Sequence, residues 1–200
     1  GAIHSSCRVA SEEDVSDQLM HISEILAEVI NEITNHVEET YVYSNYGNHL
    51  RTIQDKKDSV HTDNMEKIIP WWLKQRFAGS ENCNKIHVID SEFYEFTKLN
   101  ILGYNICTVH GDLDNFRNLG LTVNTIFSKL YNETIDYTLS GDKHHLEEFE
   151  QYGIESMLVR SLCGTDDYAN DKRLYSNAGQ TFMVFNKDDG RECTYNIKLN

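Results

Sequence analysis

The fold is decided by residues 104–112, which read YNICTVHGD. The first six residues are rich in β-branched and aromatic side chains, the composition of a β-strand. This run ends at His110 and Gly111, where a polar loop begins. Loops held at the end of a rigid strand commonly carry functional side chains. The segment therefore predicts a strand that places His110 in a candidate functional loop.

Two other segments have the same organisation. The run YVY at residues 41–43 precedes the polar loop SNYGNH at 44–49, and a strand predicted at residues 134–139 precedes GDKHH at 141–145. Each short motif is weak alone, because such sequences recur by chance. In combination, three glycine-containing loops at strand ends predict side chains that converge on a common metal.

The helical segments lie mainly in the first part of the chain. Apolar residues recur at steps of three and four over residues 15–37, which predicts a long amphipathic helix. Ser11 is its expected N-cap, followed by acidic residues that oppose the helix dipole. A second helix is expected over residues 62–77, with a kink or break at Pro70. A third is expected at residues 123–131.

Strands dominate the rest of the sequence. Beyond those already named, strands are predicted at residues 86–89, 93–97, 154–159, 181–185 and 193–199. Helices followed by many strands with few crossovers indicate an α+β or layered α/β fold, in which sheets pack face to face under flanking helices. The pattern does not separate parallel from antiparallel pairs.

Size and cysteine usage limit the class of protein. The 200 residues, 40% of them hydrophobic, contain no linker-like stretch and predict a single domain over residues 1–200. Five cysteines, an odd number without a CxxC pair, argue against a disulfide framework or a zinc ribbon. The sequence has no signal-peptide core and no apolar run of about 18 residues. We expect a cytoplasmic protein with no membrane partner, in the host cytoplasm if a phage encodes it.

The charge balance limits the choice of partner. The chain has 32 acidic and 18 basic residues, a formal net charge of −14. An acidic surface repels phosphate backbones and loses the counterion release that drives non-specific nucleic-acid binding. A long basic groove is therefore not expected. Most of the carboxylates are expected to serve solubility, and only those gathered at a cleft would bear on metal binding.

The order of the three loops resembles a known family. A strand followed by GNH, a strand followed by HGD and a strand followed by G-x-x-H resemble the last three motifs of the calcineurin-like metallophosphoesterases, over residues 40–186. The loops at 47–51 and 141–145 are most similar to phage and bacterial phosphoesterases described as DNA-repair exonucleases. The resemblance implies an αββα sandwich of two packed mixed sheets. It also implies that this sequence is the C-terminal portion of the domain, with the first strands missing.

The resemblance implies a dinuclear metal site. Its expected ligands are Asn48, His110, Asp142 and His144, and His49 is the expected general acid beside the leaving group. Two divalent ions are implied, Mn²⁺ most of all, with Fe, Mg²⁺ or Zn²⁺ as alternatives. These ions would polarise the phosphoryl oxygen and activate a water for attack on phosphorus.

The sequence departs from the family pattern in three places. Leu50 stands where the family has an acidic residue that orients the catalytic histidine, and Asp142 stands where it has the first histidine of its last motif. His145 could substitute for the latter. The early Asp-x-His and Gly-Asp motifs are not found before the first helix. Arg51 is the expected ligand of a substrate phosphate.

Two functions follow from these observations. The first is a metal-dependent phosphoesterase that hydrolyses phosphomonoesters or phosphodiesters, nucleotides and nucleic acids among them, and that is at most weakly active as this 200-residue chain alone. The alternative is a non-catalytic binding module that retains the fold with a degenerate metal site. Residues upstream of Gly1 that carry the two early motifs would favour the enzyme.

Overall fold

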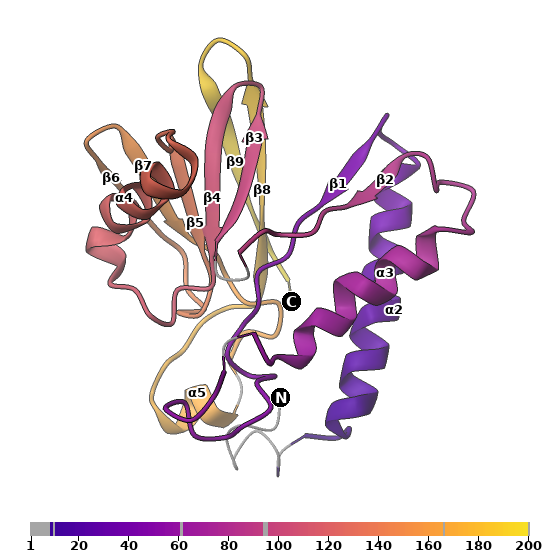
Figure 1. The fold of residues 1–200 in the computed structure, drawn as a ribbon. Coiled ribbons are helices and arrows are strands. Elements are labelled where there is room, and N and C mark those ends of the chain that lie inside the picture. The colour runs from indigo at the N-terminus through magenta and orange to yellow at the C-terminus, as the bar shows by residue number, and fades with distance from the viewer. Residues whose placement is uncertain (1–8, 10, 61, 94–95, 166, 200) are drawn as a thin grey trace. The chain divides into compact units, whose positions relative to one another are not determined.

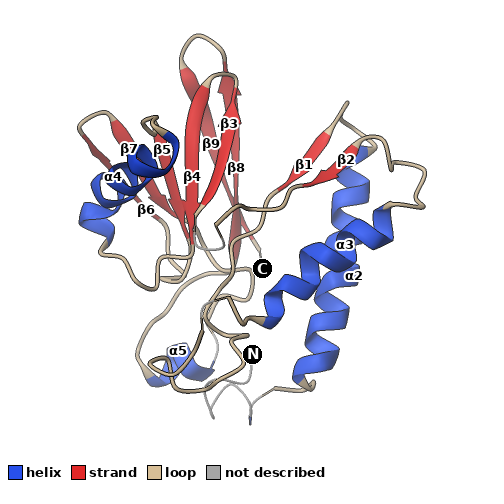
Figure 2. Ribbon diagram, in the orientation of Figure 1, coloured by secondary structure: helices blue, strands red, loops and turns tan. Residues whose placement is uncertain are grey.

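The computed structural model describes residues 9, 11–60, 62–93, 96–165 and 167–199 (Figure 1). The chain forms two compact units that divide between residues 94 and 95, and each unit is described by itself. Both units combine helices and strands (Figure 2). No helix in the described part of the chain is both long and apolar enough to cross a membrane.

The first unit pairs two helices with a small parallel sheet. Its elements are α2 (Val15–Thr34), β1 (Thr40–Val42), the 3₁₀ helix η1 (Met65–Lys67), α3 (Ile68–Phe77) and β2 (Ile86–Val88). Strands β1 and β2 are parallel, and Thr40 lies opposite Ile86. The core combines side chains from both helices with one from β2: Ala27, Ile30, Leu73, Phe77 and Ile86. This core carries the loop between β1 and η1 that contains the GNH motif.

The limits of α2 differ from the prediction. The helix begins at Val15 with Asp14 as N-cap, so the prediction of Ser11 as N-cap is wrong. The Gln18 side chain donates hydrogen bonds to Ser11 Oγ and to the Glu13 carbonyl, which holds residues 11–13 in a turn outside the helix. The helix ends at Thr34, whose buried hydroxyl bonds to the carbonyl of the preceding turn.

The buried face of α2 is also rotated from the predicted stripe. Small residues, Ser23 and Ala27, lie on the buried side, whereas Val29 and Ile33 are 50% exposed. Periodicity identified the helix correctly but not which edge of its apolar stripe is packed. Small side chains permit close helix packing, and a hydrophobicity pattern does not count them as a packed face.

Pro70 does not interrupt α3. It lies in the first turn of the helix, where amide groups have no acceptor within the helix and a missing N–H costs little. The change from 3₁₀ to α geometry comes just before it, at Ile68. Asn64 caps the start of η1, because its side-chain oxygen accepts from the Glu66 amide.

The second unit is built on a five-stranded mixed sheet. Its elements are β3 (Thr97–Ile101), β4 (Tyr104–Val109), η2 (Phe116–Asn118), α4 (Leu119–Tyr131), β5 (Tyr137–Ser140), β6 (Glu147–Gln151), β7 (Ile154–Leu158), α5 (Asp167–Asp171), β8 (Gly179–Asn186) and β9 (Gly190–Lys198). The sheet order is β3-β4-β5-β7-β6. The three central strands are parallel and the two edge strands antiparallel. Strands β8 and β9 form a separate antiparallel hairpin.

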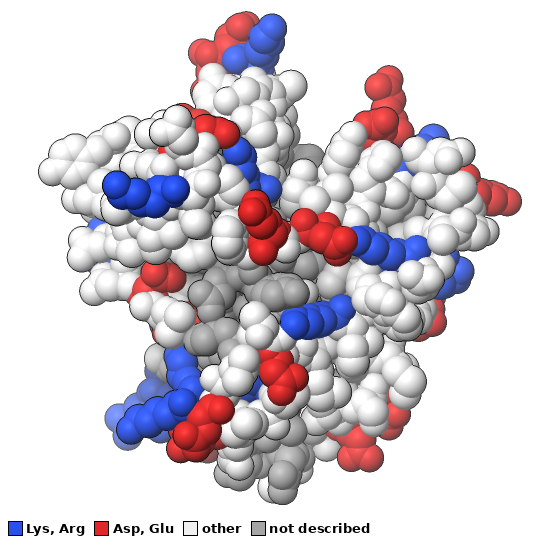
Figure 3. Space-filling view, in the orientation of Figure 1, with Lys and Arg blue, Asp and Glu red and all other residues white. Residues whose placement is uncertain are grey.

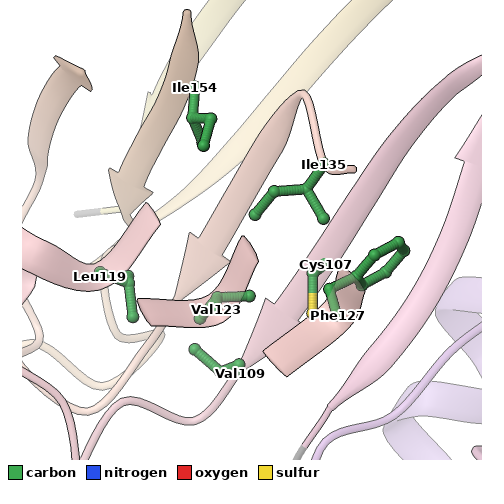
Figure 4. Packing of buried hydrophobic residues seen from close by; sticks show 7 residues of the cluster. All are labelled: Cys107, Val109, Leu119, Val123, Phe127, Ile135 and Ile154. Atoms are coloured by element: carbon green, nitrogen blue, oxygen red, sulfur yellow. The ribbon is translucent and has the colours of Figure 1, made fainter. Parts of the chain in front are cut away.

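Helix α4 covers one face of this sheet. Leu119, Val123 and Phe127 of the helix pack against Cys107 and Val109 of β4 (Figure 4). Burial raises the pKa of the Cys107 thiol to about 12, so this cysteine is an unreactive packing residue. This core packs α4 against β4 and so holds in place the strand that ends just before His110.

The hairpin β8–β9 contacts the opposite face of the sheet. The rings of Tyr137 and Phe185 meet edge to face at 5.2 Å, and the Arg191 guanidinium pairs with Glu148 and Glu155. The unit is thus layered as helix, mixed sheet and antiparallel hairpin. The predicted class, α/β with a mixed sheet and flanking helices, is confirmed.

Candidate active site

The candidate site in the second unit lies at the carboxyl ends of the parallel strands. Val109, Ser140 and Leu158 are aligned across β4, β5 and β7, so the loops that follow these strands start at the same edge of the sheet. Backbone pairing continues one residue further, since the Gly141 amide donates to the His110 carbonyl at 3.0 Å. This edge is where open α/β sheets commonly bind ligands.

Gly111 permits the close approach of two of these loops. Its φ of +100° lies in the left-handed region, and a Cβ placed there would lie 2.1 Å from Ser140 Oγ. That hydroxyl instead lies 3.2 Å from the His110 carbonyl and donates a hydrogen bond to it. The glycine of the HGD motif is therefore required by the contact between the ends of β4 and β5.

His110 and Asp142 form a partly buried pair at this edge. His110 Nε2 lies 3.4 Å from Asp142 Oδ1, and the two side chains are 24% and 18% exposed. At this distance the contact is an ion pair rather than an aligned hydrogen bond. His110 Nε2 is also buried and has no hydrogen-bond partner. Lys143 Nζ lies 2.6 Å from the other carboxylate oxygen. His110, with Lys143 after it, holds the pKa of the Asp142 carboxyl well below its ordinary value, although burial acts in the opposite direction.

This pKa shift has a direct consequence for stability. Because the carboxyl has a lower pKa in the folded chain than the unfolded value of about 3.9, its contribution is complete above that value and is lost as the pH falls toward the folded pKa. Asp142→Asn should lower the free energy of unfolding by about 1.5 to 3 kcal/mol near neutral pH. The difference from wild type should shrink steadily as the pH falls below about 3.9, as measured by urea unfolding of the metal-free chain. Asparagine tolerates the left-handed backbone at this position, where φ is +55°. A stability difference that does not change with pH would contradict the electrostatic origin.

The loop after β5 also carries His144 and His145. His144 is partly exposed, and its backbone is left-handed with φ of +58°. His145 Nδ1 lies 2.9 Å from the Lys143 carbonyl, and its Nε2 lies 3.5 Å from Glu147 Oε2. His145 is thus engaged by its own loop and the following strand, which disfavours it as a substitute for Asp142.

In the first unit, Glu66 of η1 and Asn64, the N-cap of η1, hold the loop that carries the GNH motif. The Gly47 amide donates to Glu66 Oε2 at 2.7 Å, and the Asn64 side chain donates to the Gly47 carbonyl at 2.7 Å. The Met65 amide closes the loop on the Leu50 carbonyl. A carboxylate therefore does bind this loop, but it comes from residue 66 rather than from the position after His49.

Asn48 and Arg51 have different environments within this loop. Asn48 Oδ1 is buried and has no hydrogen-bond partner. Arg51 donates to three backbone carbonyls, those of Asn48, Ile53 and Gln54, at 2.7, 3.1 and 2.8 Å. The contacts of Arg51 stabilise the loop and leave two of its five N–H donors for a ligand.

The predicted site residues are therefore divided between the units. Asn48, His49 and Arg51 lie in the first, whereas the second contains His144 and brings His110 and Asp142 together. Within the described ranges, no group of three or more His, Cys, Asp or Glu side chains is placed to hold a metal. Two of the predicted ligand atoms, Asn48 Oδ1 in the first unit and His110 Nε2 in the second, are buried and lack hydrogen-bond partners.

Arg160 is a candidate that the sequence analysis missed. It follows β7 by two residues and so belongs to the same edge of the sheet as His110 and Asp142. The strand predicted at residues 154–159 already placed it at a strand end. The criterion for the other three loops was a polar segment at a strand end that contains a glycine and a histidine. Without the requirement for a histidine, the same criterion would have selected Arg160.

Sequence comparison finds one distant relative. No protein-family model matches the chain. The chain is 23% identical over 192 residues to the SPbeta prophage-derived uncharacterized protein YonJ of Bacillus subtilis. The match covers 92% of this chain but 45% of that protein, so the chain spans about half the length of the curated relative it matches.

Structural comparison finds weak similarities. Wild-type Vps29 of Entamoeba histolytica, solved with Zn²⁺, is 16% identical with a TM-score of 0.36, over 57% of this chain and 69% of that chain. A conserved uncharacterized protein of Streptococcus pneumoniae, described as a predicted phosphoesterase, is 12% identical with a TM-score of 0.38, over 88% and 91% of the two chains. TM-scores below 0.5 do not establish a shared arrangement of the whole chain.

Proposed function

We propose that the chain is part of a metal-dependent phosphoesterase that hydrolyses phosphomonoesters or phosphodiesters, nucleotides and nucleic acids among them. The observation that carries the proposal is the state of two buried atoms, Asn48 Oδ1 and His110 Nε2. They are among six buried side-chain polar atoms without a hydrogen-bond partner in the described structure, and both belong to motifs selected from the sequence. A buried polar atom without a hydrogen-bond partner costs about 1 to 3 kcal/mol, a cost that a bound cation would remove for Asn48 Oδ1 and for a deprotonated His110 Nε2.

The donor set suits a hard or borderline divalent ion. Amide, imidazole and carboxylate groups from Asn48, His110, Asp142 and His144 would hold the metals, of which Mn²⁺ fits the mixed oxygen and nitrogen ligands. Bound divalent ions supply polarisation of the phosphoryl oxygen and a water of lowered pKa. The lowered pKa of Asp142 keeps its carboxylate charged and ready to bind a cation.

The side chains of the protein would perform the proton transfer and the positioning. His49, next to a predicted ligand, would donate a proton to the departing oxygen. Arg51 has donors left to orient a substrate phosphate from the same loop. Basic and acidic side chains are interspersed on the face shown in Figure 3, so no continuous basic patch is seen on that face. Bound cations, rather than a basic surface, would attract the anionic substrate.

The prophage-derived relative supports a phage origin for this protein and a place of action in the host cytoplasm. The alternative function, a non-catalytic binding module, is favoured by Leu50 and Asp142, which depart from the family pattern. The phosphoesterase would hydrolyse a phosphoester substrate, whereas the binding module would not.

The test is hydrolysis of bis-p-nitrophenyl phosphate by the full-length protein with Mn²⁺. We expect turnover that EDTA abolishes and added Mn²⁺ restores, because the metals supply the nucleophile. The 200-residue chain alone should be at most weakly active. No turnover by the full-length protein with Mn²⁺, Mg²⁺, Zn²⁺ or Fe²⁺, despite stoichiometric metal binding, would establish the binding module instead.

A further inference from the structure

Arg160 occupies a defined place beside the His110–Asp142 pair. The Val159 amide donates to the Ser140 carbonyl at 2.9 Å, so parallel pairing of β5 and β7 continues to that residue. Arg160 comes next, two residues after the end of β7, the strand that pairs with β5 before the Asp142 loop. Adjacent strands lie about 4.8 Å apart, so the backbones that carry Arg160 and Asp142 leave the sheet as neighbours.

The stem of Arg160 is held by packing. A Cβ built on Gly179 would lie 2.7 Å from Arg160 Cδ and 3.6 Å from its Cβ, so the side chain lies directly against the start of β8. The Gly179 amide donates to the Ser161 carbonyl at 3.0 Å, which ties the two backbones together. Glycine at this position therefore leaves the space that the arginine stem occupies.

The guanidinium of Arg160 has no acceptor in the described structure. Its Nε is buried without a hydrogen-bond partner, and no ion pair or hydrogen bond of the described residues involves its side chain. Two other arginines of this unit are paired, Arg117 with Glu147 at 2.9 Å and Arg191 with two glutamates, whereas Arg173 is exposed to solvent. The described residues thus leave this partly buried cation unpaired, although the chain contains 32 acidic residues.

A buried, unpaired N–H is costly, and the cost is recovered when an anion supplies the acceptor. The planar guanidinium matches two oxygens of a phosphate group, and an arginine with a packed stem loses little entropy on binding. We propose that Arg160 binds the phosphate group of the substrate at the carboxyl edge of the sheet, beside His110 and Asp142. This rests on the proposed function for the identity of the substrate, but the anion site itself is a property of the second unit.

The test is titration of the metal-free full-length protein with inorganic phosphate, followed by ³¹P NMR and calorimetry. Arg160→Gln should weaken phosphate binding at least about tenfold, because it removes the charge-assisted hydrogen bonds of the guanidinium to the phosphate. Arg160→Lys should bind with intermediate affinity, since it retains the charge without the two-point contact. Arg117→Gln is the matched control and should bind as wild type, because Arg117 is largely exposed and already paired.

Each result decides the inference. Wild-type affinity in both Arg160 variants, or no phosphate binding by wild type, would overturn it. If Arg160→Gln fails to fold, the Lys variant alone decides, since unchanged affinity there excludes a two-point contact. Loss of phosphate binding in a protein without turnover would support the anion site and reject the esterase. Mn²⁺-dependent turnover with KM unchanged in Arg160→Gln would support the esterase and reject Arg160 as the ligand of the substrate phosphate.

Discussion

Replacing His110 by Asn is expected to lower the affinity of the full-length protein for Mn²⁺ by at least about tenfold, and its turnover at saturating substrate in limiting metal by a similar factor. The cause is the loss of imidazole Nε2, which is buried without a hydrogen-bond partner 3.4 Å from Asp142 Oδ1. The loss should be the same for every phosphoester, because a metal ligand serves each of them. The affinity for Mn²⁺ is measured by metal content after dialysis and by a calorimetric Mn²⁺ titration.

His36→Asn is the matched control for this experiment. His36 lies after the end of α2, is largely exposed and pairs with Glu32 at 3.1 Å, so its removal should leave metal content and rate unchanged. Equal metal content and equal rate in His110→Asn and wild type would remove His110 from the metal site. Excess Mn²⁺ that restores the rate of His110→Asn would confirm that affinity, rather than chemistry, was lost.

Local sequence patterns predicted much of the second unit because its strands are regular and its core is continuous. The strand at residues 104–109 was predicted with the limits that β4 has, and the parallel strand β7 within one residue. Strand β6 was missed because its sequence, EEFEQ, carries three carboxylates on an edge strand where burial is only partial. Of the strand predicted at residues 93–97, residues 94 and 95 lie outside the described part, and Thr97 begins β3, which runs to Ile101 in antiparallel pairing with β4. Pairing partners of this kind are not visible in a local window.

The site was predictable where a single strand and its loop suffice, and not where distant residues meet. The HGD motif located His110, and the order of the loops linked it with Asp142, which the structure places within ion-pair distance. The hydrogen bond between Gly47 and Glu66 spans 19 residues and could not be read from the GNH motif. The environment of Arg160 likewise depends on a distant residue, because its side chain packs against Gly179 of β8. Burial of its guanidinium nitrogen is a tertiary property that no sequence pattern encodes.

The grouping of Asn48 and His49 with the ligands of the second unit stays a prediction, and kinetics can test it without reference to geometry. His49→Asn in the full-length protein should leave Mn²⁺ content nearly unchanged. It should lower the rate at least about a hundredfold for esters of poorly departing alcohols, whose oxygen needs a proton as the bond to phosphorus breaks. The loss should be much smaller for bis-p-nitrophenyl phosphate, because nitrophenolate departs without protonation.

The contrast between the two histidine variants separates their roles. His110→Asn should affect good and poor leaving groups alike and be corrected by excess metal, whereas His49→Asn should discriminate between leaving groups and be insensitive to metal. An equal loss for both esters in His49→Asn would reject the general-acid role while leaving the metal site intact. A wild-type rate for both esters would exclude His49 from the chemistry. A general acid contributes only where negative charge builds on the departing oxygen, so dependence on the leaving group is the property that a purely structural histidine in the GNH loop could not imitate.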